Sequence, residues 1–145
     1  TQTKDVNWQQ SPSLLVIEFI MDYRVWNDSA VQRIHHDNDS AEIAKQIQAD
    51  WQQLIDKFCR PDFMAQPASC QPVSLHDITR EDVVSAETVD GQALIQTRIH
   101  SGVEHDLQRT EVSFEYELRR DNSRWFLEQV YAIHAEGRLP ILAQQ

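Results

Sequence analysis

Residues 110–134 read TEVSFEYELRRDNSRWFLEQVYAIH, and this stretch decides the fold. Apolar and polar side chains alternate from Thr110 to Arg119, which is the period of a strand with one buried face. The residues at 121–123 predict a turn, and those at 125–134 predict a returning strand. The expected inward side chains are Val112, Phe114, Tyr116 and Leu118, and the expected outward ones are Glu111, Ser113, Glu115, Glu117 and Arg119.

The segment before this hairpin repeats the strand pattern. Residues 83–89 and 93–99 predict two strands, and Asp90-Gly91 between them is a strong hairpin signal. Residues 101–106 are expected to form the next connection. Because each strand follows its neighbour through a short turn, the second half of the chain predicts an antiparallel meander.

The first half of the chain has a helical period instead. Ser11 and Pro12 suit the N-cap and the first position of a helix over residues 12–34. Asn27, Asp28 and Ser29 are expected to bend or interrupt this helix, because their side chains compete for backbone hydrogen bonds. The expected buried face, with its flanks, comprises Leu14, Leu15, Ile17, Phe19, Met21, Tyr23, Trp26, Ala30 and Ile34.

A second helix is predicted over residues 40–58. Asp39 and Glu42 form a variant of the capping box at its start, and Arg60-Pro61 ends it. Its apolar stripe comprises Ile43, Ile47, Trp51, Leu54, Ile55 and Phe58. Residues 61–73 contain three prolines and predict a loop. Helices followed by an antiparallel sheet make an α+β fold, with residues 1–10 as a polar tail and 11–145 as one domain.

Composition narrows the classes of function. The formal charge of −10 on 145 residues disfavours binding to nucleic acid and to anionic membranes, and it favours a basic partner. Solubility alone is the simpler explanation of such acidity. No segment approaches the roughly 20 apolar residues that span a bilayer. Cys59 and Cys70 fit no zinc or redox spacing, so we favour free thiols over a local disulfide.

Two stretches carry a resemblance to a known superfamily. The helix segment FIMDYRVWN at 19–27 and the closing strand RWFLEQV at 124–130 resemble the NTF2-like superfamily over about residues 11–135. That resemblance implies a cone-shaped (cystatin-like) fold, with the N-terminal helices packed on a curved antiparallel sheet. Superfamily enzymes such as ketosteroid isomerase and scytalone dehydratase hold their acid and base groups inside this cone.

Within the superfamily, the chain looks most like the NTF2-fold immunity proteins of bacterial toxin systems. MDYRVWND at 21–28 and Glu136-Gly137-Arg138 carry this likeness. It implies a cytoplasmic, non-catalytic inhibitor that needs no cofactor and neutralises a basic toxin, for example a nuclease, by occlusion. A homodimer through the outer sheet face is a further interpretation.

The acidic clusters are the expected contact with such a partner. They lie at 37–42, at 81–87 and on the outward phase of the strand at 110–119, and a solvated face is the ordinary explanation for any one of them. An acidic surface speeds association with a basic protein and can mimic phosphates. The residues predicted to bind the partner are Asp37, Asp39, Glu42, Glu81 and Asp82.

The rival hypothesis is a small-molecule-binding protein, or an isomerase-like or dehydratase-like enzyme, that uses the cone interior. The residues predicted to line it are Tyr23, Trp26, Phe114 and Tyr116. The inward phase of the clearest strand carries no carboxylate, so we expect no group for proton transfer there. Among the histidines, His35-His36 lacks a metal-ligand spacing, while His76 and His134 stand alone and indicate nothing.

Overall fold

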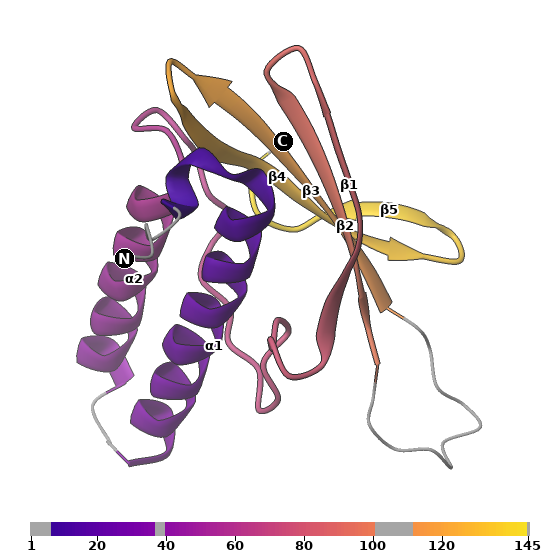
Figure 1. The fold of residues 1–145 in the computed structure, drawn as a ribbon. Helices are drawn as coiled ribbons and strands as arrows, with labels where there is room; N and C mark the ends of the chain where they lie inside the picture. Colours follow the sequence, from indigo (N-terminus) through magenta and orange to yellow (C-terminus); the bar gives the residue numbers. More distant parts are fainter. Residues whose placement is uncertain (1–6, 37–39, 101–111, 145) are drawn as a thin grey trace, which may run out of the picture.

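The structure is a computed structural model and describes residues 7–36, 40–100 and 112–144. Two helices pack against one face of a five-stranded antiparallel sheet in the order β1-β2-β3-β4-β5 (Figure 1). The predicted α+β class and the meander are therefore confirmed. The elements are η1 Trp8–Gln10, α1 Pro12–His36, α2 Ser40–Phe58, β1 Glu81–Val89, β2 Gln92–Ile99, β3 Val112–Asp121, β4 Arg124–His134 and β5 Gly137–Pro140.

Helix α1 begins where the sequence predicts it. The Ser11 hydroxyl accepts a hydrogen bond from the Leu14 amide at 3.3 Å, as an N-cap does. The expected bend at residues 27–29 is wrong, because α1 continues unbroken and the Asn27 side chain bonds to a distant segment. Met21 and Ile34, expected on the buried face, are exposed.

Helix α2 lies beside α1 and contributes its apolar face to the core. Its predicted stripe is confirmed, since Ile43, Trp51, Leu54, Ile55 and Phe58 are buried. The expected polar tail is partly wrong, because residues 8–10 form the 3₁₀ turn η1. Trp8 in that turn packs on Phe58 with ring centroids 5.2 Å apart, which extends the core beyond the start of α1.

Both predicted hairpin turns require left-handed backbone. Asp90 and Gly91 have φ angles of 51° and 77°, the type I′ pattern that joins two twisted strands through two residues. Asn122 has a φ of 59° in the β3–β4 turn. Strand β5 is an addition that the sequence did not predict. It pairs with the end of β4 and turns the C-terminal segment back along the sheet.

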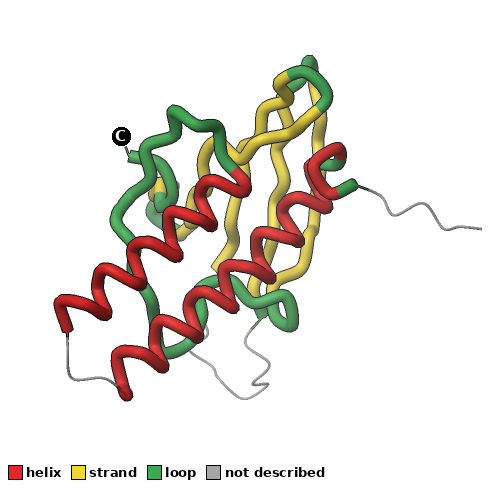
Figure 2. Tube along the Cα trace, turned by 90° about the vertical axis from the view of Figure 1, so that its left-hand side faces the viewer, coloured by secondary structure: helices red, strands yellow, loops and turns green. Residues whose placement is uncertain are grey.

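The sheet turns the predicted face inward. Phe114, Tyr116 and Leu118 on β3 are buried, in phase with Ile95 and Thr97 on β2, and Val112 is partly buried. The inward phase of β3 is therefore confirmed. The helices cover this face, so the core lies between the helix pair and the inner side of the sheet (Figure 2).

Residues 59–80, here called the strap, run from the end of α2 to the start of β1. The strap has no helix or strand, and two sets of hydrogen bonds hold it in place. The Gln66 carbonyl accepts from the Trp51 indole, and the Gln66 amide donates to the carbonyl of Leu142. The Asn27 side chain, fully buried in α1, donates to the Gln71 carbonyl at 2.9 Å and accepts from the Gln71 amide at 2.8 Å. These hydrogen bonds tie the strap to α1, to α2 and to the C-terminal segment.

Candidate functional site

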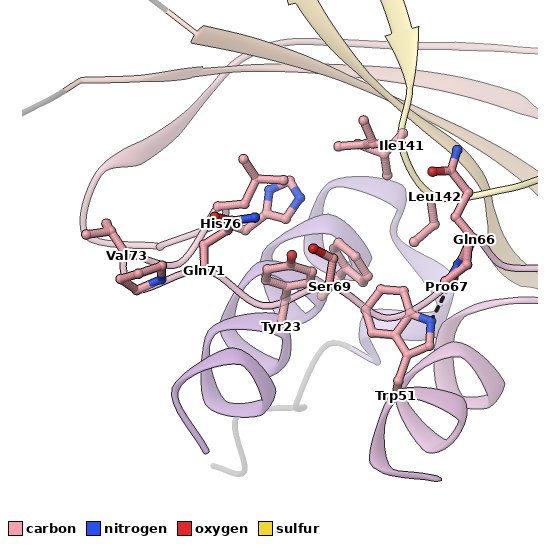
Figure 3. A pocket seen from close by; sticks show the side chains of 14 residues that line it. Tyr23, Trp51, Gln66, Pro67, Ser69, Gln71, Val73, His76, Ile141 and Leu142 are labelled. Atoms are coloured by element: carbon pink, nitrogen blue, oxygen red, sulfur yellow. Dashed lines mark hydrogen bonds between the residues drawn. The ribbon is translucent and has the colours of Figure 1, made fainter. Parts of the chain in front are cut away.

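A pocket of about 660 Å³ lies between α1, the strap and the C-terminal segment (Figure 3). Its walls are mostly apolar and aromatic, as is usual for a small-molecule site. The lining residues are Phe19, Tyr23, Trp51, Gln66, Pro67, Ser69, Gln71, Pro72, Val73, Leu75, His76, Val130, Ile141 and Leu142. No Asp, Glu, Lys or Arg is among these described residues.

Behind the His76 side of this pocket lies a buried polar network. The Tyr116 hydroxyl donates to Oε2 of Glu81, and the Thr97 hydroxyl donates to the same oxygen at 2.6 Å. Oε1 of Glu81 lies 3.0 Å from Nδ1 of His76, which is also 2.9 Å from the Tyr116 hydroxyl. All four side chains are at most 2% exposed. The network therefore joins the strap to strands β1, β2 and β3.

A tight turn brings His76 and Glu81 together. The carboxylate of Asp77 accepts from the amide and the hydroxyl of Thr79, and the Asp77 carbonyl accepts from the amides of Arg80 and Glu81. Burial opposes ionisation of Asp77, but the Thr79 hydrogen bonds and the charge of Arg24 outweigh it and lower the pKa of Asp77. The turn reverses the chain, so the two side chains meet although five positions separate them.

With Glu81 ionised, a count of donors and acceptors assigns the proton of the His76 ring. The single proton of Tyr116 goes to Glu81, so the hydroxyl can only accept from His76. Nδ1 of His76 then carries a proton toward Oε1 of Glu81 and the Tyr116 oxygen. Nε2 is the nitrogen left for a ligand, and His76 lines the pocket. A carboxylate that holds one nitrogen of an imidazole makes the other a positioned proton acceptor.

The two tyrosines of the site remain hydrogen-bond donors at neutral pH. Burial, the charge of Glu81 and the hydrogen bond to Glu81 raise the pKa of Tyr116 well above its ordinary value. Burial, with a smaller effect of Cys70, raises the pKa of Tyr23 to about 12. The Tyr23 ring meets the His76 ring edge to face, with centroids 4.7 Å apart, so both groups serve the same end of the pocket.

The residues that were predicted to bind a partner do not form one exposed cluster among the described residues. Glu81 is a correction: it is buried in the network and cannot belong to an exposed acidic cluster. Asp82 is exposed on β1 and lies 3.1 Å from His100, and Glu42 is exposed at the start of α2. Asp37 and Asp39 lie outside the described residues, as does Glu111. On the outer sheet face, Glu115 pairs with Arg138 of β5 at 2.9 Å.

Of the residues that were predicted to line the interior, the structure places only Tyr23 on the pocket wall. Phe114 and Tyr116 are buried behind it, and Trp26 packs on Trp51 and borders a surface groove between the helices. The apolar phase of β3 led us to expect no group for proton transfer in the interior, and the Glu81 carboxylate of β1 reaches Tyr116 behind the pocket wall. His76 does not stand alone, because its ring contacts Glu81 and Tyr116.

A strand-phase signal could have located Glu81. The predicted strand began at residue 83, whereas β1 begins at Glu81, which pairs with Ile99 on β2. Extending the strand back by two residues places Glu81 in the inward phase with Val83. The register shift between Val83 and Ser85 then hides this phase from a simple alternation count.

Other chemistry finds little support in the described residues. Cys59 and Cys70 are free thiols, as expected, and burial raises the pKa of the Cys59 thiol, which makes it a poor nucleophile. The described part of the chain holds no cluster of three or more His, Cys, Asp or Glu side chains suited to a metal. Its helices are too short or too polar to cross a membrane.

Searches of protein-family models, of curated proteins and of solved structures find no match to this chain.

Proposed function

We propose that this protein is an NTF2-like domain that binds a small molecule in its interior and exchanges a proton with it through His76. One observation carries this proposal: the Glu81 carboxylate holds His76 in a dry network at the wall of a 660 Å³ pocket. The order of helices before a five-stranded meander supports the superfamily assignment.

The roles follow from the contacts. Thr97 and Tyr116 hold the Glu81 carboxylate, Glu81 orients His76, and Nε2 of His76 takes a proton from the ligand. Glu81 then stabilises the imidazolium, as an acidic partner does in carboxylate–imidazole pairs. Return of the proton to another atom of the ligand completes an isomerisation, and its delivery to a leaving hydroxyl completes a dehydration.

This geometry changes the order of the two main hypotheses. The enzyme was the weaker one because the inward phase of β3 is apolar. The carboxylate instead enters from the start of β1, and the imidazole enters from the strap. Both groups are sequestered from water, which strengthens their electrostatic interaction.

Filling the pocket tests the binding claim. Ser69 is an exposed strap residue on the pocket wall, so Ser69→Trp places an indole in the cavity without touching the network. We expect naphthalene, used as an apolar probe, to shift the Trp51 indole NMR resonance in the wild type and in the matched Ser69→Ala variant. It should leave Ser69→Trp unchanged. An equal response in all three proteins, or no response in any, contradicts the proposed binding.

The immunity protein remains a second candidate because of the exposed carboxylates at the start of β1 and α2. In that case Asp37→Lys combined with Glu42→Lys should slow association with a basic toxin, for instance a nuclease, by about tenfold or more at low salt. Surface plasmon resonance at two salt concentrations measures this. If the double variant associates as fast as the wild type, and salt does not change either rate, the acidic residues do not form the contact. Ser69→Trp separates the two candidates, since filling the pocket should not affect protection against a toxin.

A further inference from the structure

One edge of the sheet points to a second binding surface, which is independent of the interior pocket. We infer that strand β1 accepts an extended segment of another protein, rich in lysine or arginine, which pairs with residues 85–89 as an added strand. The free edge, its charge and an acidic hollow beside it each support a part of this statement. None of the residues 85–90 lines the interior pocket.

Strand β1 pairs on one side only. It is the first strand in the sheet order and bonds to β2, so the other side of its backbone has no strand partner among the described residues (Figure 1). A register shift between Val83 and Ser85 interrupts this pairing, and residues 85–89 then follow residues 92–96 in regular register. Residues 85–89 thus form a regular edge of the usual strand length, and such an edge can pair with an added strand.

This edge lacks the usual protection against strand addition. Proteins commonly shield an edge with a short strand, with proline or with lysine. The opposite edge has such protection, because β5 has four residues and ends at Pro140. Strand β1 has nine residues and contains neither proline nor lysine, and its Val84 and Val89 are 52% and 67% exposed. The regular part of β1 is therefore open to a partner.

The charge of the partner segment follows from the side chains of this edge. Residues 82–90 include Asp82, Glu87 and Asp90, all of them exposed, and no lysine or arginine. Asp82 lies beside His100, whereas Glu87 and Asp90 have no cation within ion-pair distance among the described residues. Two copies of this protein, each with a formal charge of −10, would bring like charges together across the edge. A second copy is therefore disfavoured, and a basic segment is favoured.

An acidic hollow beside the edge can receive a basic side chain. The Ser85 hydroxyl bonds across to β2 on the outer sheet face, and the strand period places Glu87 on the same face. Glu87 lines a hollow of about 340 Å³ together with Asp90, Glu117 and Glu128. No lysine, arginine or histidine is among the described residues that line it. A long cationic side chain of the added strand that lies next to Glu87 can reach these carboxylates.

Peptides of equal length test the inference. One alternates lysine with threonine, one alternates glutamate with threonine, and one alternates lysine with proline, which keeps the charge but prevents strand pairing. Each peptide is added to the whole protein, and hydrogen exchange of the backbone amides is followed by NMR. We expect the lysine–threonine peptide to slow exchange at alternate amides of residues 85–89 by about tenfold, when its free concentration is about ten times its dissociation constant. The other two peptides should leave these amides unchanged.

Glu87→Lys should weaken binding of the lysine–threonine peptide by about 3- to 10-fold, because an attraction becomes a repulsion. The matched variant Glu136→Lys changes the net charge equally at an exposed position beside β5, and it should bind as the wild type does.

Several results would overturn the inference. Equal protection by the glutamate–threonine peptide contradicts the preference for a basic segment. Absence of binding, or binding of the lysine–threonine peptide without protection of residues 85–89, contradicts strand addition. Slow exchange at all of these amides without peptide, together with dimers in sedimentation, assigns the edge to a second copy. The proposed function stands in each of these cases, because naphthalene binding tests it separately.

Discussion

Glu81→Ala should lower the free energy of unfolding by about 3–5 kcal/mol, because it leaves two buried hydroxyl donors without their acceptor, at about 1–3 kcal/mol each, and opens a cavity at a buried position. The carboxylate accepts from Tyr116 and Thr97 and faces Nδ1 of His76, and all of these groups are buried. Removing it leaves the Tyr116 and Thr97 hydroxyls without this acceptor in a buried interior, where each unsatisfied group is costly, while Nδ1 of His76 keeps the Tyr116 oxygen. Urea unfolding monitored by tryptophan fluorescence measures the loss.

The neighbouring acid provides a matched control. Asp82 is exposed and lies 3.1 Å from the exposed His100, so Asp82→Ala should change the free energy of unfolding by at most about 0.5 kcal/mol. Glu81→Gln keeps the shape and two acceptor sites, so its cost should lie between the two alanine variants. If Glu81→Ala costs no more than Asp82→Ala, Glu81 is solvated, and the buried network described above does not exist.

Asn27→Ala should have the next largest effect, a loss of about 2–4 kcal/mol of unfolding free energy. The Asn27 side chain is fully buried. It donates to the Gln71 carbonyl and accepts from the Gln71 amide, as a neighbouring strand would. The substitution removes two hydrogen bonds, at about 0.5–1.5 kcal/mol each, and leaves a small cavity at a fully buried position, at about 1 kcal/mol more. Because Gln71 lies on the pocket wall, the same change should loosen the strap.

A thiol-reactivity experiment separates loosening from global unfolding. Cys70 is adjacent to Gln71 and partly exposed, whereas Cys59 is buried in the core. Asn27→Ala should speed the reaction of Cys70 with an alkylating reagent and leave Cys59 slow. Gln32→Ala, at an exposed position of the same helix, is the matched control and should leave both rates unchanged. Equal acceleration of both thiols by Asn27→Ala would mean that the strap opens only with the whole fold.

The elements that periodicity determines were predictable. Helices α1 and α2 and the β3–β4 hairpin agree with their apolar spacing and turn residues to within a few positions, because each buries a face that the spacing defines. Strand β5 was not predictable, since its four residues carry no alternation of their own and pair only because β4 offers an edge. The 3₁₀ turn at Trp8 depends likewise on a distant partner, Phe58.

The candidate site was less accessible from sequence. Tyr23 and Tyr116 were recognisable because helix and strand periods place them inward. His76 was not, because an irregular strap and a tight turn position it and no period describes them. Glu81 was missed because the predicted strand began at residue 83, two residues after the true start of β1. A charged residue in a run of acidic residues is normally solvated. Only the contacts with Thr97, Tyr116 and His76 show that Glu81 is buried. Asn27 presents the same difficulty, since its partner lies 44 positions away.

The protonation of the His76 ring tests the central claim most directly. Long-range ¹H–¹⁵N NMR distinguishes protonated from unprotonated ring nitrogens, and a His76→Gln spectrum assigns the signals among the six histidines. The account predicts that Nδ1 of His76 carries the proton of the neutral ring, held by Glu81, and that naphthalene bound in the pocket shifts Nε2 and not Nδ1. A ring protonated only at Nε2, or a ligand response at another histidine with His76 unchanged, would contradict it.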